Sequence, residues 1–193
     1  MCIRDRFSAD MVVYEKSGET LPDMDITERP DFEFHRGGNG ESSATAYGMG
    51  FNLASDIFIK VQEYWHNTMY YLPYETYGNK GDEENYHPEW YAAPGVAAES
   101  NQICATAHGN AESLKKMEET VADTVYRHLE DNPDRYAITF TVMDNNNVCK
   151  CEACTAEREK YGTDSAAYIK LVNNVSDEVD KRFEKEGKRR DYM

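Results

Sequence analysis

The stretch from Arg135 to Cys154 constrains the fold of this chain more than any other segment. It opens with Tyr136 to Met143, where nearly every residue is β-branched, aromatic or otherwise apolar, as expected of a buried β-strand. Asp144, three asparagines and the motif C-x-C-x-x-C follow directly. Open α/β sheets and α/β barrels place their chemistry at the carboxyl ends of buried strands. The segment therefore predicts an active-site edge at Asp144.

The composition argues against two classes of partner. The 193 residues, enough for one domain with a full core, carry a formal net charge of −15. They include no basic stripe that could neutralise the phosphates of a nucleic acid. No apolar run approaches the ~20 residues that a membrane span needs. We therefore expect neither nucleic-acid binding nor a membrane span.

Neither end of the chain looks natural. Residues 1–6, MCIRDR, show no amphipathic, targeting or capping pattern and resemble translated adapter sequence, so we exclude them and Cys2 from the fold. The other end stops just after a helix, where we expect another strand to follow. We expect residues 7–193 to be part of one α/β domain that is truncated at both ends.

Two amphipathic helices flank the central strand. Asn110 caps the first, which runs to about Asp131, and the second runs from about Asp164 to Glu186. The residues expected to face the core are Leu114, Met117, Val121, Val125 and Leu129 in the first helix, and Ile169, Val172, Val175, Val179 and Phe183 in the second. With a short strand expected over 101–106, the order predicts βαβ units and a parallel sheet. Part of an eight-stranded (β/α)8 TIM barrel fits best, and a small doubly wound parallel sheet is the alternative.

Parallel strands would bring three loops to one edge of the sheet. The first begins with Trp65-His66-Asn67, the second is Ala107-His108-Gly109, and the third runs from Asp144 to Cys154. The first loop is rich in aromatic residues and includes both tryptophans, Trp65 and Trp90. Flat aromatic faces beside hydrogen-bonding groups suit sugar rings. The alternative is that these aromatics pack the loop onto the fold.

Asp144 is the candidate general acid, or the group that orients the reacting centre; alternatively it caps its own loop through Asx-type hydrogen bonds. Glycoside hydrolysis normally uses two carboxylates, and the asparagines after Asp144 are neutral. Glu33, on an expected N-terminal strand over 32–36, is one candidate partner. Otherwise the partner lies in a missing C-terminal part, or a substrate acetamido group acts as the internal nucleophile.

His66 could contact substrate or transfer a proton, or simply satisfy loop carbonyls. For His87 we favour a structural role, because Pro88 indicates a rigid turn into a short helix.

Four cysteines are expected to converge. Cys149, Cys151 and Cys154 lie in the loop after the central strand, and Cys104 lies at the end of the preceding one. They could form a closed structural zinc site, two disulfides in an exported protein, or free thiols. The spacing differs from the paired C-x-x-C of a zinc ribbon, so the three alternatives stay open. None is catalytic, because a four-thiolate site leaves no position for substrate.

Together these pieces resemble DUF4838, a family of bacterial, mostly exported, glycoside-hydrolase-like proteins. The segments that carry the resemblance are Trp65-His66-Asn67 before Leu72-Pro73, His87 to Tyr91, Gln102 to Cys104, and above all Asp144-Asn145 with the cysteine motif. Phe32 to Arg36 is similar to the family's N-terminal strand, which ends in an arginine. Val142-Met143 departs from the polar Gln-Asn pair that many relatives carry before the aspartate.

The resemblance implies a (β/α)-barrel glycosidase module in an exported parent protein, whether periplasmic, cell-surface or secreted. Members placed in glycoside hydrolase family 163 are endo-β-N-acetylglucosaminidases acting on N-glycans, which suits acetamido-assisted hydrolysis. The leading hypothesis is a glycan-processing hydrolase that needs no cofactor for catalysis and acts on a glycan or glycoprotein. Its expected catalytic residues are Asp144 and Glu33, and its expected substrate contacts are Arg36, Trp65, His66, Trp90, His108 and Asn145. The alternatives are a non-catalytic carbohydrate-binding module and a cysteine-clamped interaction domain.

Overall fold

The computed structural model describes residues 58–59, 61, 66–80, 84–188 and 190–192. Contacts divide the chain into two units, Met1–Ile57 and Phe58–Met193, and the described residues all belong to the second. The N-terminal strand expected over 32–36 lies outside the described residues. The described part is mostly helical and contains one parallel pair of short strands.

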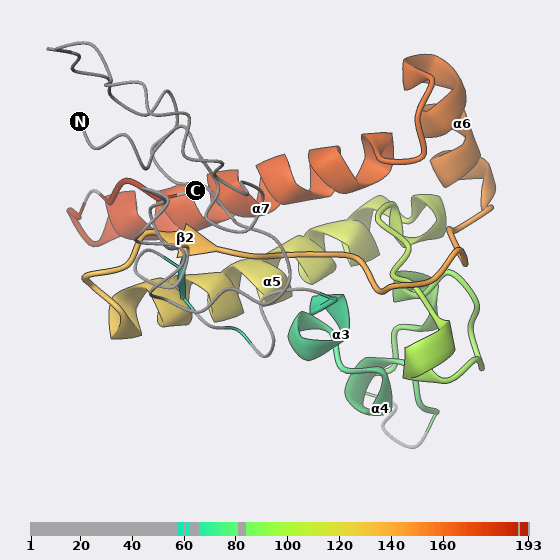
Figure 1. Ribbon diagram of the computed structural model, residues 1–193, viewed down its shortest axis with the longest axis horizontal. Helices are drawn as coiled ribbons and strands as arrows, with labels where there is room; N and C mark the ends of the chain where they lie inside the picture. Colours follow the sequence, from blue (N-terminus) through green and yellow to red (C-terminus); the bar gives the residue numbers. More distant parts are fainter. Residues whose placement is uncertain (1–57, 60, 62–65, 81–83, 189, 193) are drawn as a thin grey trace, which may run out of the picture. The chain divides into compact units, whose positions relative to one another are not determined.

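Two long helices, α5 (Ala111–Asp131) and α7 (Ala166–Lys185), pack along one another (Figure 1). The first predicted helix is confirmed as α5. Its start is fixed by Asn110, whose side-chain oxygen accepts a hydrogen bond from the Ser113 N–H at 3.1 Å. Its predicted apolar face is buried at all positions but Leu114, which is partly buried.

The predicted inward face of α7 was wrong at two positions. Ile169 and Val172 are 56% and 41% exposed, whereas Leu171 is 1% exposed. Apart from Ala166, the buried residues of this helix lie at intervals of four, at Ala167, Leu171, Val175, Val179 and Phe183. This stripe excludes Ile169 and Val172, which project from other sides of the same turns.

The strands are much shorter than the sequence predicts. β1 (Phe58–Ile59) pairs in parallel with β2 (Ala137–Ile138), with Phe58 opposite Ala137. The expected strand over 136–143 is thus regular only at β2, and the expected strand over 101–106 contributes one antiparallel bridge, between Tyr91 and Ile103. A mixed α/β arrangement is present, but the described residues do not confirm a TIM-barrel fragment.

Short helices complete the unit. They are α3 (Thr68–Tyr71), α4 (Tyr74–Tyr77), α6 (Glu152–Tyr161) and the 3-10 turns η2 (Pro88–Trp90), η3 (Ala98–Ser100) and η4 (Ala107–Gly109). The turn expected at Pro88 is confirmed as η2. α6 was not predicted; it ends at Gly162, whose φ of 74° is the left-handed conformation that glycine adopts most easily. An extended segment connects β2 to α6 (Figure 1).

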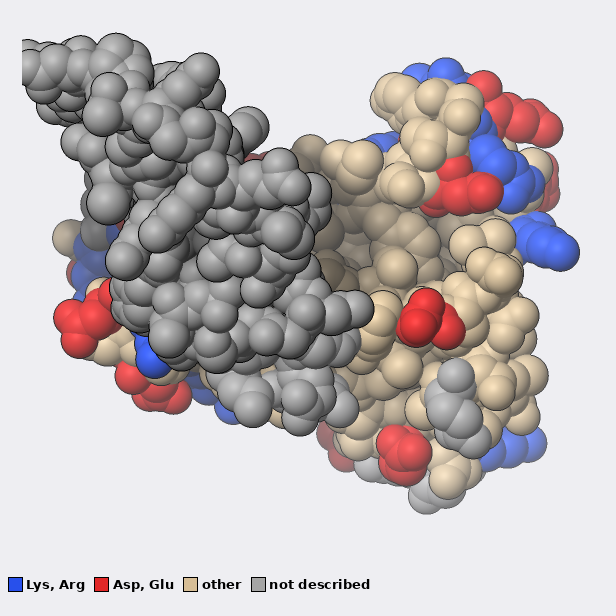
Figure 2. All heavy atoms as spheres, viewed as in Figure 1, with Lys and Arg blue, Asp and Glu red and all other residues tan. Residues whose placement is uncertain are grey.

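No helix within the described ranges is long and apolar enough to cross a membrane. On the face shown in Figure 2, basic and acidic side chains are interspersed around α6 and do not form a basic stripe. Two ion pairs involve residues of α6, Arg158 with Asp164 and Glu157 with Lys170. Exposed pairs of this kind contribute little to stability.

Candidate functional site

The four cysteines of the described unit converge on one point. The Sγ atoms of Cys104, Cys149, Cys151 and Cys154 all lie within 4.8 Å of one another. The Cys104 sulfur is 3.8 Å from that of Cys151 and 3.7 Å from that of Cys154. A disulfide joins its sulfurs at about 2.0 Å, and all four residues are free thiols here. The convergence expected from the sequence is therefore present, without the disulfides that were one alternative.

The two sulfur separations from Cys104 match those of a tetrahedral metal site. Four sulfurs placed about 2.3 Å from a central zinc ion lie about 3.8 Å from one another. Cys104 and Cys149 are buried, and Cys151 and Cys154 are partly buried. The cluster could therefore hold one metal ion with all four positions taken by protein ligands.

Local backbone geometry directs hydrogen-bond donors at the sulfurs. The His108 N–H donates to Cys104 Sγ at 3.2 Å, and the Cys154 N–H donates to Cys151 Sγ at 3.4 Å. The first contact depends on a left-handed run in η4, with φ of 44° at Ala107, 52° at His108 and 86° at Gly109. The second lies at the start of α6, where the helix dipole favours a negatively charged sulfur.

The thiols share their protons unequally. Hydrogen bonds from the Cys149 and Cys154 thiols lower the pKa of Cys104, although its burial acts in the opposite direction. The hydrogen bond to Cys104 in turn raises the pKa of Cys154 to about 12. Without a cation, negative charge is thus favoured on one sulfur at the expense of its neighbours. A metal ion would remove this competition, because its charge stabilises all four thiolates.

A second group of polar residues lies at the end of the segment after β2. Asn67 is fully buried, and its Nδ2 donates to both the carbonyl oxygen and the hydroxyl of Thr139, at 3.0 and 2.9 Å. Its Oδ1 accepts from the Thr141 N–H at 2.8 Å. One buried amide therefore takes the place of a neighbouring strand and binds the loop of His66 to residues 139–141.

This connection places His66 beside the segment that leads to Asp144. His66 Nδ1 lies 2.9 Å from the Val142 carbonyl oxygen, which can only accept, so Nδ1 must carry the proton. In neutral His66, Nε2 is then an acceptor on an exposed side chain and has no hydrogen-bond donor among the described residues. Asp144, also exposed, follows two residues after Val142. His66 thus contacts the backbone two residues before Asp144, and its placement on one edge with the Asp144 carboxyl remains a prediction.

Asn145 is held by the protein itself. Its Nδ2 donates to the Asn101 carbonyl at 3.0 Å, and its Oδ1 accepts from the Asn147 N–H at 3.0 Å and from Gln102 Nε2 at 3.1 Å. Both lone pairs of the oxygen and one of the two amide protons are occupied. The side chain predicted to contact substrate is therefore used largely to hold its own loop against residues 101–102.

The amino-acid sequence matches the family described as "Domain of unknown function (DUF4838)" over residues 7–186. The chain belongs to the DUF4838 family. No curated protein and no solved structure matches it significantly. The matched range includes the whole cysteine cluster, His66 and Asp144.

The other predicted contacts of this DUF4838 domain are placed differently. Trp90 is fully buried, stacks on His87 with ring centroids 4.2 Å apart and donates from Nε1 to Ser113 Oγ at 2.9 Å. The prediction that it contacts a sugar is corrected, because no ring face is exposed; the packing alternative applies here. His108 is exposed, with Nε2 3.0 Å from the Tyr91 carbonyl. Glu33, Arg36 and Trp65 lie outside the described residues.

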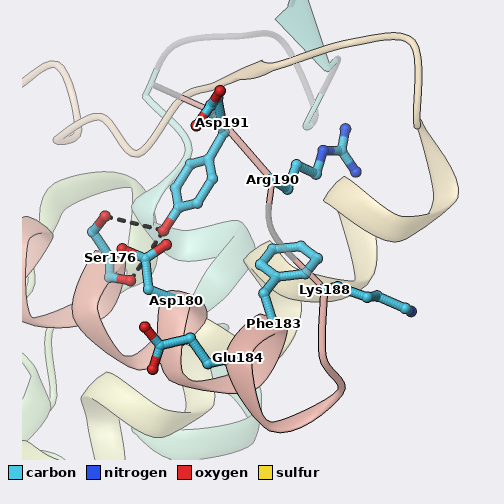
Figure 3. Close-up of a pocket in the computed structure, with 8 residues that line it drawn as sticks. Ser176, Asp180, Phe183, Glu184, Lys188, Arg190 and Asp191 are labelled. Atoms are coloured by element: carbon cyan, nitrogen blue, oxygen red, sulfur yellow. Dashed lines mark hydrogen bonds between the residues drawn. The ribbon is translucent and has the colours of Figure 1, made fainter.

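Two pockets of the DUF4838 domain lie away from the predicted site. One, of about 470 Å³, lies at the C-terminal end of α7 and is shown in Figure 3. It is lined by Ser176, Asp180, Phe183, Glu184, Lys188, Arg190, Asp191 and Tyr192. The other, of about 510 Å³, lies at the start of α5 and includes His87, Glu89 and Ser113. Neither contains a described residue of the predicted catalytic, substrate or metal sites.

Sequence reasoning missed three polar residues that shape this site: Asn67, Gln102 and Thr106. The Thr106 hydroxyl lies 3.2 Å from Cys154 Sγ and 3.4 Å from Cys104 Sγ. Polar residues inside or beside apolar segments were the available signal, since buried amides and hydroxyls need partners. Their particular partners depend on tertiary contacts across 41 to 74 residues of chain.

Proposed function

We propose that this DUF4838 chain is part of a glycan-processing, glycoside-hydrolase-like domain in which a structural zinc centre holds the loop after Asp144. The observation that carries the proposal is the hydrogen bond from His66 Nδ1 to the Val142 carbonyl at 2.9 Å. It fixes the imidazole on the carbonyl of the residue two positions before Asp144, and we infer that Nε2 lies on the same edge as the exposed Asp144 carboxyl. An acid and a proton acceptor on one edge can serve glycosidic bond cleavage.

Zinc is the metal that best fits the cysteine cluster. Zinc binds thiolates tetrahedrally, has no redox chemistry and forms closed four-cysteine sites in small structural centres. Cys104, Cys149, Cys151 and Cys154 would hold it, with the N–H groups of His108 and Cys154 supporting the sulfurs from outside. Its role would be structural: it would join the loop after Asp144 to the segment before α5.

The chemistry proposed for the edge is hydrolysis of a β-N-acetylglucosaminide in an N-glycan. Asp144 would give a proton to the oxygen of the leaving sugar, or orient the acetamido group of the substrate. In the assisted route that acetamido oxygen attacks the anomeric carbon, the glycosidic bond breaks, and water then opens the cyclic intermediate. Glu33 is the second carboxylate if the reaction instead needs two. The free Nε2 of His66 would accept a hydrogen bond from a substrate hydroxyl.

The test is glycan release from an N-glycosylated protein by the full-length parent protein, compared with its Asp144→Asn variant. We expect the variant to lose a factor of about 10² or more in turnover. Unchanged turnover would remove Asp144 from the mechanism. Glycan binding without release by the wild type would favour the non-catalytic carbohydrate-binding alternative. Unfolding on chelation, with no effect of glycans on stability, would favour the cysteine-clamped interaction domain.

A further inference from the structure

Gln102 connects the two sides of Asp144. Its side chain is 2% exposed, and its Oε1 accepts from the Met143 N–H at 3.1 Å. Its Nε2 donates to the Met143 carbonyl at 2.6 Å and lies 3.1 Å from both the carbonyl oxygen and Oδ1 of Asn145. A single buried amide therefore binds the residue before Asp144 and the residue after it.

This arrangement replaces a missing strand. Regular pairing of the central segment ends with β2 at Ile138, five residues before Met143. The N–H and carbonyl of Met143, which a neighbouring strand would otherwise satisfy, are both bonded to the Gln102 side chain. Neighbouring contacts extend the attachment: Asn147 Nδ2 donates to the Ser100 carbonyl at 2.6 Å. Residues 100–102 thus form the support on which the loop of Asp144 lies.

The chemistry of the contact requires an amide. Met143 offers one donor and one acceptor, and Asn145 offers two acceptors, so the contacting side chain must both accept and donate. A glutamate of the same shape would accept from Met143 but would place its second oxygen against three acceptor oxygens. A methionine of similar length would make none of these bonds and would leave the partly buried Met143 N–H without the Gln102 acceptor.

We propose that Gln102 is a positioning residue that sets the direction of the Asp144 carboxyl. This inference rests on the function proposed above, in which Asp144 acts on substrate. Gln102 makes no contact with substrate itself; it fixes the backbone on each side of the reacting group. Displacement of a reacting group by about 1 Å can cost ~100-fold in rate without weakening substrate binding. The loss should therefore appear in kcat and leave KM nearly unchanged.

The experiment compares three variants of the full-length parent protein: Gln102→Met, Gln102→Glu and, as the control, Ser113→Ala. Ser113 bonds to Trp90 and Glu89 in the core and makes no hydrogen bond with the loop of Asp144. The readouts are backbone amide hydrogen exchange in peptides covering 141–147 and the kcat and KM for glycan release from an N-glycopeptide. The first readout does not depend on activity.

We expect both Gln102 variants to speed exchange in 141–147 by about tenfold or more, because the loop opens locally. We also expect them to lower kcat by about 10- to 100-fold with KM changed less than about twofold. The control should lower the melting temperature and leave both readouts near wild type. Gln102→Glu keeps the test valid if Gln102→Met fails to fold, because it preserves side-chain volume and the bond from the Met143 N–H.

Unchanged exchange in 141–147 would overturn the proposal, since Gln102 would not then hold the loop. Faster exchange with unchanged kcat would also overturn it, because the loop position would not matter for Asp144. If the wild type releases no glycan while the exchange responds as expected, the proposed hydrolysis fails and Gln102 keeps only its structural role. These outcomes separate failure of the inference from failure of the function on which it rests.

Discussion

Asn67 and Thr141 exchange hydrogen bonds in both directions. The Asn67 N–H donates to the Thr141 carbonyl at 3.0 Å, and Asn67 Oδ1 accepts from the Thr141 N–H at 2.8 Å. Residues 74 positions apart in the sequence thereby form a contact like that between two strands. The contact positions His66, one residue before Asn67, opposite Val142.

Replacement of Asn67 by leucine should destabilise the domain strongly, although the two side chains have similar volumes. The variant removes the amide partner of the partly buried Thr139 hydroxyl and Thr141 N–H. We expect a loss of about 2–4 kcal/mol in the free energy of unfolding, measured by urea denaturation. Asn79→Leu, at an exposed asparagine, is the matched control and should change stability by less than about 0.5 kcal/mol. Equal effects of the two changes would contradict the role assigned to Asn67.

The cysteine cluster should bind one zinc ion per chain and depend on it for stability. Removal of the metal with a strong chelator should lower the melting temperature, and added zinc should restore it. Cys104→Ser should abolish stoichiometric zinc binding, measured by metal analysis, whereas Cys2→Ser should not. Acidification should weaken binding, because protons compete with the metal for thiolates. A melting temperature that falls with reductant but not with chelator would instead support disulfides.

Substitutions can distinguish the roles of the two ring nitrogens of His66. In His66→Asn, the amide nitrogen can replace Nδ1 as donor to the Val142 carbonyl, but nothing replaces Nε2. We expect the melting temperature to remain near wild type and kcat/KM for glycan release to fall by about 10- to 100-fold. His66→Ala, which lacks both groups, should lower both quantities. Full activity in His66→Asn would exclude Nε2 from the reaction.

The two neighbouring apolar positions of α7 should respond very differently to truncation. Leu171→Ala removes a side chain that is 1% exposed and should cost about 2–4 kcal/mol. Ile169→Ala changes a residue that is 56% exposed and should cost less than about 1 kcal/mol. Chemical denaturation of the two variants provides the comparison. A large loss from Ile169→Ala would show that this side chain is covered in the intact protein.

The sequence predicted the long helices better than the strands. In α5, apolar residues and the cap at Asn110 agree on a single helical register, so location and buried face were both predictable. In α7 two sets of apolar residues could face the core, one that includes Leu171 and one that includes Ile169 and Val172. Packing against α5 buries the set that includes Leu171. The strand pattern after Arg135 indicated extended backbone correctly. It could not show that side chains of Asn67 and Gln102 would take the place of paired strands.

The candidate site was predictable by residue type and only partly by role. The expected order of strands indicated that Cys104 would join the other three cysteines, which the structure confirms, whereas the pairing of Asp144 with His66 at one edge stays a prediction. The role of Trp90 could not be decided, because a buried and a sugar-binding tryptophan have the same local sequence pattern. α6 escaped prediction because none of its side chains is buried, so its apolar residues form no stripe.

No side chain of α6 is fully buried. A helix of 10 residues is marginal on its own in water, and this one packs on the core only through partly buried side chains such as that of Cys154. Its beginning is the cysteine cluster itself, since Cys151 is its N-terminal cap and Cys154 lies in its first turn. The stability of α6 should therefore depend on whether the four cysteines hold a metal ion. A protease added to the metal-free protein should cut first within α6. The length of the resulting fragments would then show whether the cysteines held a metal ion.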